Sequence, residues 1–450
     1  MQFDHDTIVA PATASGGALA VVRVSGDDAF AVCDRIFRGR TRLSDADGYT
    51  VHYGRIVDGD RILDEVLATV FRAPHSYTGE NAVEISCHGS SHILSELLRL
   101  LLAAGARMAA PGEFTLRAYF AGKFDLAQAE AVADLIAASS RAEHALAANQ
   151  MRGGYSAALD GLRDRLLHLA SMLELELDFG EEEVEFADRT ELQRLMEKIG
   201  EEISKLQRSF ALGNVLKEGV PVALVGAPNA GKSTLLNRLL HEERALVSEI
   251  AGTTRDVIEE TVDLGGIRFR FVDTAGIRTT DDRLERMGIE RTLDRIARAR
   301  IVVRLLDAET FGGEVPPADF ELPEGASLVT VVSKLDLRRD LPLPEGVIGL
   351  SARTGEGVDA LCGRLLQEVD AGALDRGETV VSNGRHYEAL TAAHEALDRA
   401  LTGLRTDLPT DLLAEEVRQV IRRLGEITGR GVILSDEILA SIFSKFCIGK

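Results

Sequence analysis

The residues of this chain best suited to chemistry lie in the run Gly226–Thr234, which reads GAPNAGKST. The run matches G-x-x-x-x-G-K-[ST], the loop that binds the phosphates of nucleoside triphosphates. An apolar run, Val220–Val225, precedes it and an amphipathic run, Leu235–Leu240, follows it, as the strand and helix around such a loop require. Backbone N–H groups of the loop would bind phosphate oxygens. Lys232 would reach the β- and γ-phosphates, and the Ser233 hydroxyl would bind Mg²⁺.

Two later stretches favour guanine as the base. In Ser333–Asp336 (SKLD), Asp336 would accept hydrogen bonds from guanine N1 and N2, which adenine does not offer. In Ser351–Arg353 (SAR), a backbone N–H would bind guanine O6. Each pattern is weak by itself, but their order after the phosphate loop favours GTP over ATP. Because Ser333 stands where Asn or Thr is usual, the sequence predicts weaker guanine binding, with specificity retained by Asp336.

Two segments between the loop and the base-reading residues would respond to the γ-phosphate. In Asp273–Gly276 (DTAG), the Asp would hold Mg²⁺ through water and the Gly N–H would contact the phosphate. In Gly252–Asp256 (GTTRD), Thr254 would complete the coordination of Mg²⁺. The alternative for the second segment is a polar surface loop.

The residue after DTAG is Ile277, where Ras-like enzymes carry a Gln that orients the attacking water. Isoleucine has no hydrogen-bonding group, so another residue must position the water. Glu285 is the candidate, and Arg255 and Arg278 are candidates to stabilise the developing charge. The alternative is that Glu285 only pairs with a neighbouring arginine.

The composition restricts the kind of protein that carries this loop. The chain has 450 residues and a net charge of −21, which argues against general coating of nucleic acid and leaves a local basic surface open. It contains no apolar run of membrane-spanning length and no signal-peptide pattern at its start. Its four cysteines are scattered without a C-x-x-C pair, which predicts free thiols and a cytoplasmic location.

The periodicity of apolar residues predicts α/β and all-α parts along the chain. Residues 1–120 read as an α/β domain, and residues 121–216 are helical. Strands alternate with helices over 217–375, which predicts a parallel, doubly wound P-loop domain. Because residues 376–450 are helical again, we predict one discontinuous helical domain with the nucleotide domain inserted; the alternative is two unrelated helical pieces. In the first domain, β-like runs cover Ala18–Val24, Tyr49–Ile56, Val66–Phe71 and Ala82–Ser86, and a helix is expected over His92–Ala104.

Several stretches together resemble one known family. Inside the nucleotide domain they are the phosphate loop, Ile250–Asp256, Asp273–Ile277 and Glu285–Glu290; outside it they are Pro111–Thr115 (PGEFT), Lys123–Glu130 (KFDLAQAE) and Cys447–Lys450 (CIGK). With them the chain resembles the bacterial tRNA modification GTPases called MnmE or TrmE. The resemblance covers the whole chain. LAQAEA and CIGK are more specific than the phosphate-loop motifs, which many GTPases share.

The resemblance implies an N-terminal folate-binding domain that also dimerises, a discontinuous helical domain and an inserted Ras-like G domain. It implies a K⁺-activated GTPase whose hydrolysis depends on G-domain dimerisation. The implied reaction adds an aminomethyl or carboxymethylaminomethyl group to C5 of the wobble uridine, position 34, of tRNA. A 5-formyl- or 5,10-methylene-tetrahydrofolate would supply the one-carbon unit. An FAD- and NADH-dependent partner of the MnmG or GidA type would act with the homodimer, as a heterotetramer without membrane contact.

The resemblance also implies roles for single residues of the nucleotide domain. Glu285 would act on the attacking water, and the side chain of Asn229 would bind K⁺ with three backbone carbonyls. The implied metal ligands are Asn229, Ser248, Ile250 and Thr253 for K⁺, and Ser233 and Thr254 for Mg²⁺. The residues expected to contact GTP are Asn229, Ala230, Gly231, Lys232, Ser233, Thr234, Ser248, Glu249, Ile250, Ala251, Gly252, Thr253, Thr254, Asp273, Thr274, Ala275, Gly276, Ser333, Lys334, Leu335, Asp336, Ser351, Ala352 and Arg353.

Four residues match the folate-contacting positions of the family: Arg23, Glu80, Lys123 and Lys450. Cationic groups suit the carboxylate tail of folate; a structural surface role is the alternative for each. Cys447 would lie beside the folate with a chemical role, and a buried structural thiol is its alternative.

One function of another class competes with wobble-uridine modification. The chain could be a GTP-switched RNA-binding or ribosome-assembly factor without modification chemistry. The N-terminal 120 residues and the CIGK end favour modification, since no KH or OB module is evident in the sequence. A membrane-acting GTPase is disfavoured because no basic amphipathic helix is evident.

Overall fold

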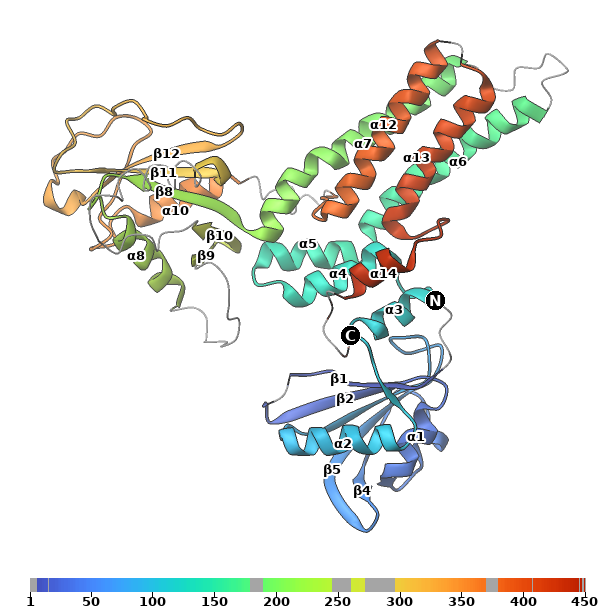
Figure 1. Ribbon diagram of the computed structural model, residues 1–450. Helices are drawn as coiled ribbons and strands as arrows, with labels where there is room; N and C mark the ends of the chain where they lie inside the picture. Colours follow the sequence, from blue (N-terminus) through green and yellow to red (C-terminus); the bar gives the residue numbers. More distant parts are fainter. Residues whose placement is uncertain are drawn as a thin grey trace, which may run out of the picture. The chain divides into compact units, whose positions relative to one another are not determined.

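The computed structural model describes residues 6–14, 16–178, 189–244, 260–271, 296–369, 379–406, 408–444, 446 and 449 (Figure 1). The chain divides into two compact units. One comprises Met1–Ile136, Gln150–His168 and Arg418–Lys450, and the other comprises Ala137–Asn149 and Leu169–Val417. Among the helices within the described ranges, none combines the length and the apolar character that crossing a membrane requires.

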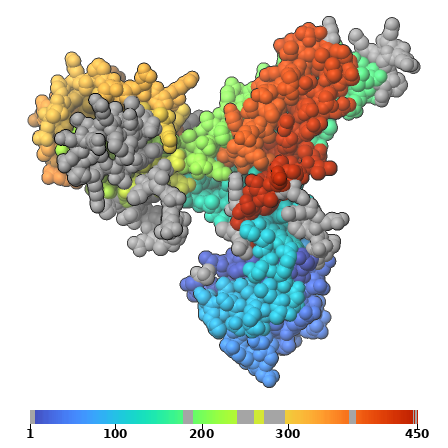
Figure 2. All heavy atoms as spheres, in the orientation of Figure 1, coloured from blue at the N-terminus to red at the C-terminus, as the bar shows by residue number. Residues whose placement is uncertain are grey.

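The N-terminal domain of the first unit is built on a seven-stranded sheet in the order β3-β4-β5-β6-β2-β1-β7. Strands β1 and β7 pair in parallel, and the other neighbours pair antiparallel. Figure 2 shows these strands and their helices as one body of blue atoms. The strands are β1 (Ile8–Pro11), β2 (Leu19–Ser25), β3 (Phe37–Gly39), β4 (Thr50–Asp58), β5 (Arg61–Phe71), β6 (Ala82–His88) and β7 (Arg107–Met108).

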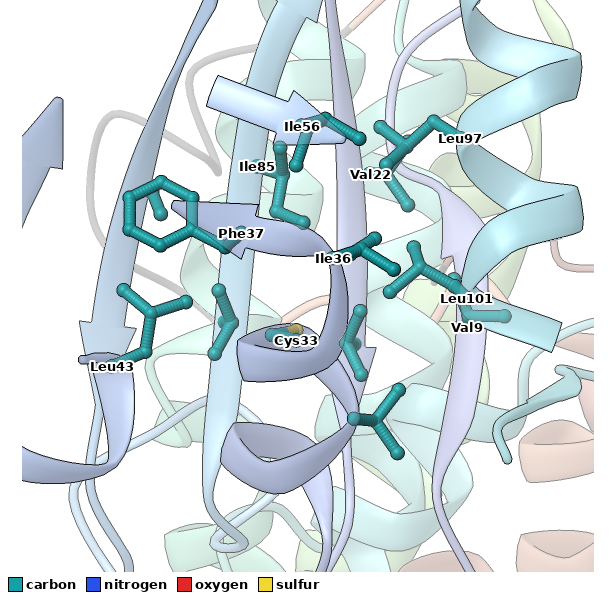
Figure 3. Packing of buried hydrophobic residues seen from close by; sticks show 14 of the residues in the cluster. Val9, Val22, Cys33, Ile36, Phe37, Leu43, Ile56, Ile85, Leu97 and Leu101 are labelled. Atoms are coloured by element: carbon teal, nitrogen blue, oxygen red, sulfur yellow. The ribbon is translucent and has the colours of Figure 1, made fainter. Parts of the chain in front are cut away.

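Helices α1 (Ala29–Ile36) and α2 (Ser91–Ala103) cover one face of this sheet. Figure 3 shows Cys33 of α1 and Leu101 of α2 among the apolar side chains of the strands. The predicted helix over His92–Ala104 is confirmed as α2. The opposite face of the sheet leaves large apolar side chains exposed: Leu19, Tyr49, Val51, Tyr53 and Leu67.

The described cysteines are free, as the sequence predicts, and two of them belong to this core. They are Cys33, Cys87 and Cys362. Burial raises the pKa of the Cys87 thiol to about 11 and that of Cys33 still higher, so both are neutral packing groups at physiological pH. The fourth cysteine, Cys447, is not among the described residues.

Helices from both ends of the sequence pack together, as a discontinuous helical domain requires. Apolar side chains of α3 (Glu113–Phe120) and α4 (Leu126–Ala137) form one core with α14 (Asp436–Phe443). In the second unit, α7 pairs lengthwise with α12, and Phe210 stacks on Tyr387 across that contact with ring centroids 4.5 Å apart. The remaining helices of this domain are α5 (Arg141–Met151), α6 (Gly154–Asp178), α7 (Arg189–Glu218), α12 (Gly384–Arg405) and α13 (Thr410–Thr428).

The nucleotide domain of the second unit holds a six-stranded sheet in the order β13-β12-β11-β8-β10-β9. All neighbours pair in parallel except β9 and β10, which form an antiparallel hairpin. This arrangement confirms the P-loop fold class predicted from the alternation of strands and helices. The elements are β8 (Val220–Gly226), α8 (Lys232–Arg244), β9 (Glu260–Leu264), β10 (Ile267–Phe271), β11 (Ile301–Asp307), β12 (Ser327–Ser333), β13 (Ile348–Gly349) and α10 (Val358–Gln367).

Candidate functional site

The phosphate loop joins the end of β8 to the start of α8. Its backbone needs glycine at Gly226, where φ is +153° and an added Cβ would lie 2.5 Å from the carbonyl oxygen of Leu305. Asn229 also adopts a positive φ of +64°, and α8 begins at Lys232. The N-terminal end of α8 therefore lies directly after the loop, as phosphate binding at a helix N-terminus requires.

The ammonium group of Lys232 folds back over the loop. Its Nζ donates hydrogen bonds to the carbonyl oxygens of Gly226 at 2.7 Å and Ala227 at 2.9 Å. These bonds hold a positive charge above the concave side of the loop. A phosphate bound there would contact both the ammonium group of Lys232 and backbone N–H groups at the start of α8.

Ser333 connects the base-reading half of the domain to the phosphate loop. Its hydroxyl is buried and donates to the carbonyl oxygen of Ala230 at 2.7 Å, sharing its proton with the carbonyl of Leu306 at 3.2 Å. Ala230 lies in the phosphate loop. The short hydroxyl thus connects the end of β12 with the phosphate loop and with β11.

Asp336 is held as an ionised acceptor. Its Oδ1 accepts a hydrogen bond from the Ser351 hydroxyl at 2.6 Å, and its Oδ2 lies 2.9 Å from Nη2 of Arg353. The Ser351 bond is the main cause that lowers the pKa of Asp336, and the charge of Arg353 adds to it. The structure therefore brings SKLD and SAR together around one carboxylate, as guanine recognition requires.

Lys334 is anchored beside them by an ion pair. Its Nζ lies 2.6 Å from Oδ2 of Asp307 at the end of β11. Burial alone would raise the pKa of Asp307, but the hydrogen bond and charge of Lys334, together with the hydrogen bond from the backbone N–H of Glu309, lower it. The Lys334 backbone is left-handed, with φ +58°, and this turns the chain from β12 toward Asp336.

Many predicted site residues belong to the segments outside the described ranges. In the nucleotide domain they are Ser248, Glu249, Ile250, Ala251, Gly252, Thr253, Thr254, Arg255, Asp273, Thr274, Ala275, Gly276, Ile277, Arg278 and Glu285; at the C-terminus they are Cys447 and Lys450.

Each of the three described residues expected to contact folate has a hydrogen-bond or ion-pair partner within the chain. Arg23 forms an ion pair with Glu84 at 2.8 Å and lies over the ring of Tyr77, with 5.1 Å between the guanidinium carbon and the ring centroid. Lys123 donates from Nζ to the carbonyl oxygen of Pro74. Glu80 accepts a hydrogen bond from the Ser25 hydroxyl at 2.7 Å.

Arg117 is a residue of this region that the motif analysis missed. Its side chain is 3% exposed, and Nη1 lies 3.0 Å from Glu80. Nη2 lies 2.6 Å from Asp6 and 2.9 Å from Glu113. Arg117 thus lies at the centre of three carboxylates, one of which is Glu80. The spacing of Glu113 and Arg117, four residues apart on α3, is the sequence signal for this pair.

The C-terminal turn approaches the same domain at β1. Gly449 has φ +103°, and an added Cβ would lie 1.9 Å from the carbonyl oxygen of Pro11. Pro11 pairs with Val22, the residue before Arg23. Glycine is therefore required at this position of the CIGK sequence, both by its backbone conformation and by the close contact.

Comparisons with known proteins agree along the whole chain. Residues 7–123 match the family model described as "GTP-binding protein TrmE N-terminus", and residues 126–447 match "MnmE helical domain". The tRNA modification GTPase MnmE of Cytophaga hutchinsonii is 50% identical over 453 residues, covering 99% of this chain and 98% of that protein. The protein of the same name from Bacteroides fragilis is 48% identical over 467 residues, covering 100% of both. Among solved structures, Era of Aquifex aeolicus bound to GDP·AlF₄⁻ is 25% identical, with a TM-score of 0.25, over 39% of this chain and 65% of that one.

Substitution of Ser333 tests the connection between the two halves of the nucleotide site. Ser333→Ala removes the hydrogen bond to Ala230, and we expect GDP to bind about tenfold more weakly, the size of one hydrogen bond. Ser333→Asn retains a donor and adds a second, so we expect tighter binding than in the wild type. Titration with a fluorescent guanine nucleotide measures both. Equal affinity of the Asn variant and the wild type would contradict the predicted weakness of serine.

Substitution of Arg117 tests the charge cluster. Arg117→Met leaves Glu113 and its neighbours without their central cation, and we expect the N-terminal domain to lose about 3–5 kcal/mol of its free energy of unfolding at neutral pH. Burial alone would raise the pKa values of Asp6 and Glu113, but hydrogen bonds from Arg107 and Arg117 lower both. This stability is therefore present above about pH 4 and is lost as the pH falls through the lowered values.

Urea unfolding followed by circular dichroism at pH 7 and in acid measures the effect. The matched control is Arg99→Met, because Arg99 is half exposed and pairs with Asp58 and Glu96 at the surface. We expect the control to change little. An equal loss in both variants would show that Arg117 has no special role.

Proposed function

The chain belongs to the MnmE family of tRNA modification GTPases, and on that premise we propose that it hydrolyses GTP to drive the modification of C5 of the wobble uridine, position 34, in tRNA. The product is the aminomethyl or carboxymethylaminomethyl form. An FAD-dependent partner of the MnmG or GidA type acts with it. A tetrahydrofolate derivative, 5-formyl or 5,10-methylene, supplies the carbon. The observation that carries this proposal is the near 50% identity to relatives over the full length of both chains.

GTP is the nucleotide that the described geometry supports. An ionised Asp336 suits the two donors of guanine, and Lys232 suits the phosphates. The GTP contacts proposed for this chain are Asn229–Thr234, Ser248–Thr254, Asp273–Gly276, Ser333–Asp336 and Ser351–Arg353.

The phosphate loop offers oxygen ligands to two cations, Mg²⁺ and K⁺. Ser233 lies at the start of α8, where a hydroxyl together with Thr254 would hold Mg²⁺. Asn229 belongs to the loop and has a left-handed backbone. Its amide oxygen, together with the carbonyl oxygens of Ser248, Ile250 and Thr253, would form an all-oxygen set suited to K⁺. A bound cation there supplies positive charge near the γ-phosphate. Glu285 positions the attacking water, since Ile277 has no group to do so.

The N-terminal domain is the proposed folate site. Arg23, Glu80, Lys123 and Lys450 bind the cofactor, and Cys447 takes part in the chemistry beside it. The approach of Gly449 to Pro11 supports the placement of the CIGK end near Arg23. We assign residues 1–120 to this folate-binding and dimerising domain, 121–216 and 376–450 to the helical domain, and 217–375 to the G domain. The homodimer acts in the cytoplasm as part of a heterotetramer with its partner.

Mass spectrometry of tRNA nucleosides tests the proposed function. A strain of the source organism that lacks this gene is expected to carry unmodified uridine at the wobble position, and the plasmid-borne wild-type chain is expected to restore the modified nucleoside. Intact wobble modification in the deletion strain would overturn the proposal and would leave a GTP-switched assembly factor as the function.

GTP turnover in K⁺ and in Na⁺ at equal ionic strength tests the cation site. We expect hydrolysis to be about 10²–10³-fold faster in K⁺, the size of the stabilisation that one well-placed charge or donor provides. Asn229→Ala should remove most of this difference while retaining GDP binding. Equal rates of the wild type in the two salts would exclude the site. For Glu285, normal hydrolysis by a Glu285→Ala variant would exclude its role with the water.

A further inference from the structure

Helix α5 of the helical domain contacts the turn of the β9–β10 hairpin in the nucleotide domain. The backbone N–H of Ala142 donates to the carbonyl oxygen of Gly266 at 2.9 Å. An N–H in the first turn of a helix has no partner within the helix. Gly265 and Gly266 both have positive φ, +60° and +87°, as the two central residues of a tight hairpin turn require. The hairpin thus satisfies a donor that α5 would otherwise leave unpaired.

An ion pair strengthens the same contact. Nε of Arg268 on β10 donates to Oε1 of Glu143 at 2.8 Å, and Nη2 of the same guanidinium donates to that oxygen as well. The other carboxylate oxygen accepts the backbone N–H of Ser139 at 2.8 Å. The Glu143 side chain is 6% exposed and that of Arg268 is 28% exposed. Both oxygens of Glu143 are therefore bonded in a half-buried setting, where loss of the charge costs more than at the surface.

Apolar packing makes this contact rigid. Ala142 and Leu146 of α5 belong to the same core as Val262, Ile267 and Phe269 of the hairpin. Interiors packed in this way transmit small displacements instead of absorbing them. A shift of the hairpin would therefore move α5 or break the contact.

The hairpin is placed to respond to the nucleotide. Strand β10 pairs in parallel with β8, which leads into the phosphate loop. In the sequence, Gly252–Asp256 lies shortly before β9, and Asp273–Gly276 follows β10 after one residue. Both segments are predicted to contact the γ-phosphate or its Mg²⁺. The hairpin therefore joins the two parts of the chain that distinguish GTP from GDP.

We propose that the contact of α5 with the β9–β10 hairpin couples the nucleotide state of the G domain to the helical domain, with Glu143 and Arg268 as positioning residues. The contact differs in strength between the GTP and GDP states, and this difference is the coupling. The inference rests on the proposed function and adds to it the element through which hydrolysis reaches the modification chemistry.

The test uses Glu143→Gln in the full-length chain, which removes the charge while retaining the volume. We expect GTP turnover in K⁺ to stay within about twofold of the wild type, because Glu143 does not belong to the nucleotide site. In the deletion strain, we expect restored wobble modification to fall about tenfold, within the range of ordinary coupling energies. The matched control is Glu197→Gln, which breaks an exposed ion pair with Arg405 inside the helical domain. The control should leave both readouts within about twofold.

Hydrogen exchange of α5 amides gives a second readout that does not depend on tRNA. In the wild type, we expect exchange at Ala142 to differ between GDP and GDP·AlF₄⁻, and Glu143→Gln should abolish the difference. Full modification together with an unchanged exchange response in Glu143→Gln would overturn the proposal, and so would an equal loss of GTP turnover and modification. If the wild-type chain fails to restore modification, the proposed function fails, while the exchange response still decides the coupling.

Discussion

The parallel pairing of β8 with β10 and β11 is the constraint on which the nucleotide domain depends. Parallel strands end at one edge of the sheet, so this register brings the phosphate loop after β8 to the same edge as Asp307 and Ser333. The Ser333 hydroxyl then binds the loop carbonyl directly. In the same sheet, β10 pairs with β8, and the turn that precedes β10 accepts the hydrogen bond from α5.

Two kinds of charged contact have separate roles in this chain. In the N-terminal domain, Arg117 gathers three carboxylates around itself and fixes the local backbone near Glu80. At the hairpin, Glu143 and Arg268 hold together segments that belong to different domains. The first stabilises the backbone within one domain, whereas the second joins two domains and is the contact that we propose to couple them.

Local patterns in the sequence predict much of this fold. The glycine pair Gly265-Gly266 predicts the β9–β10 hairpin, and GAPNAGKST predicts the phosphate loop after β8. Both features depend only on residues that are close together in the chain. Strand β5 begins at Arg61, whereas the sequence predicts a start at Val66. The first half of the strand contains charged residues that interrupt the alternation of apolar and polar positions. The Ala-rich run Leu126–Met151 predicts one helical stretch, whereas the structure has two helices, with Ser140 capping the start of α5. The ion pairs of Arg117 with Asp6 and of Arg268 with Glu143 could not be predicted from one sequence, because they join residues 111 and 125 positions apart.

We propose that GTP bound in the phosphate loop drives a reaction elsewhere in the same chain. The most direct test is the wobble nucleoside of tRNA from the deletion strain carrying the chain with Lys232→Ala, produced at the wild-type level. Because Lys232 lies over the phosphate loop and far in sequence from the N-terminal domain, the substitution should leave folate binding intact. The account predicts unmodified uridine, as in the strain without the gene. Modification at the wild-type level would contradict it.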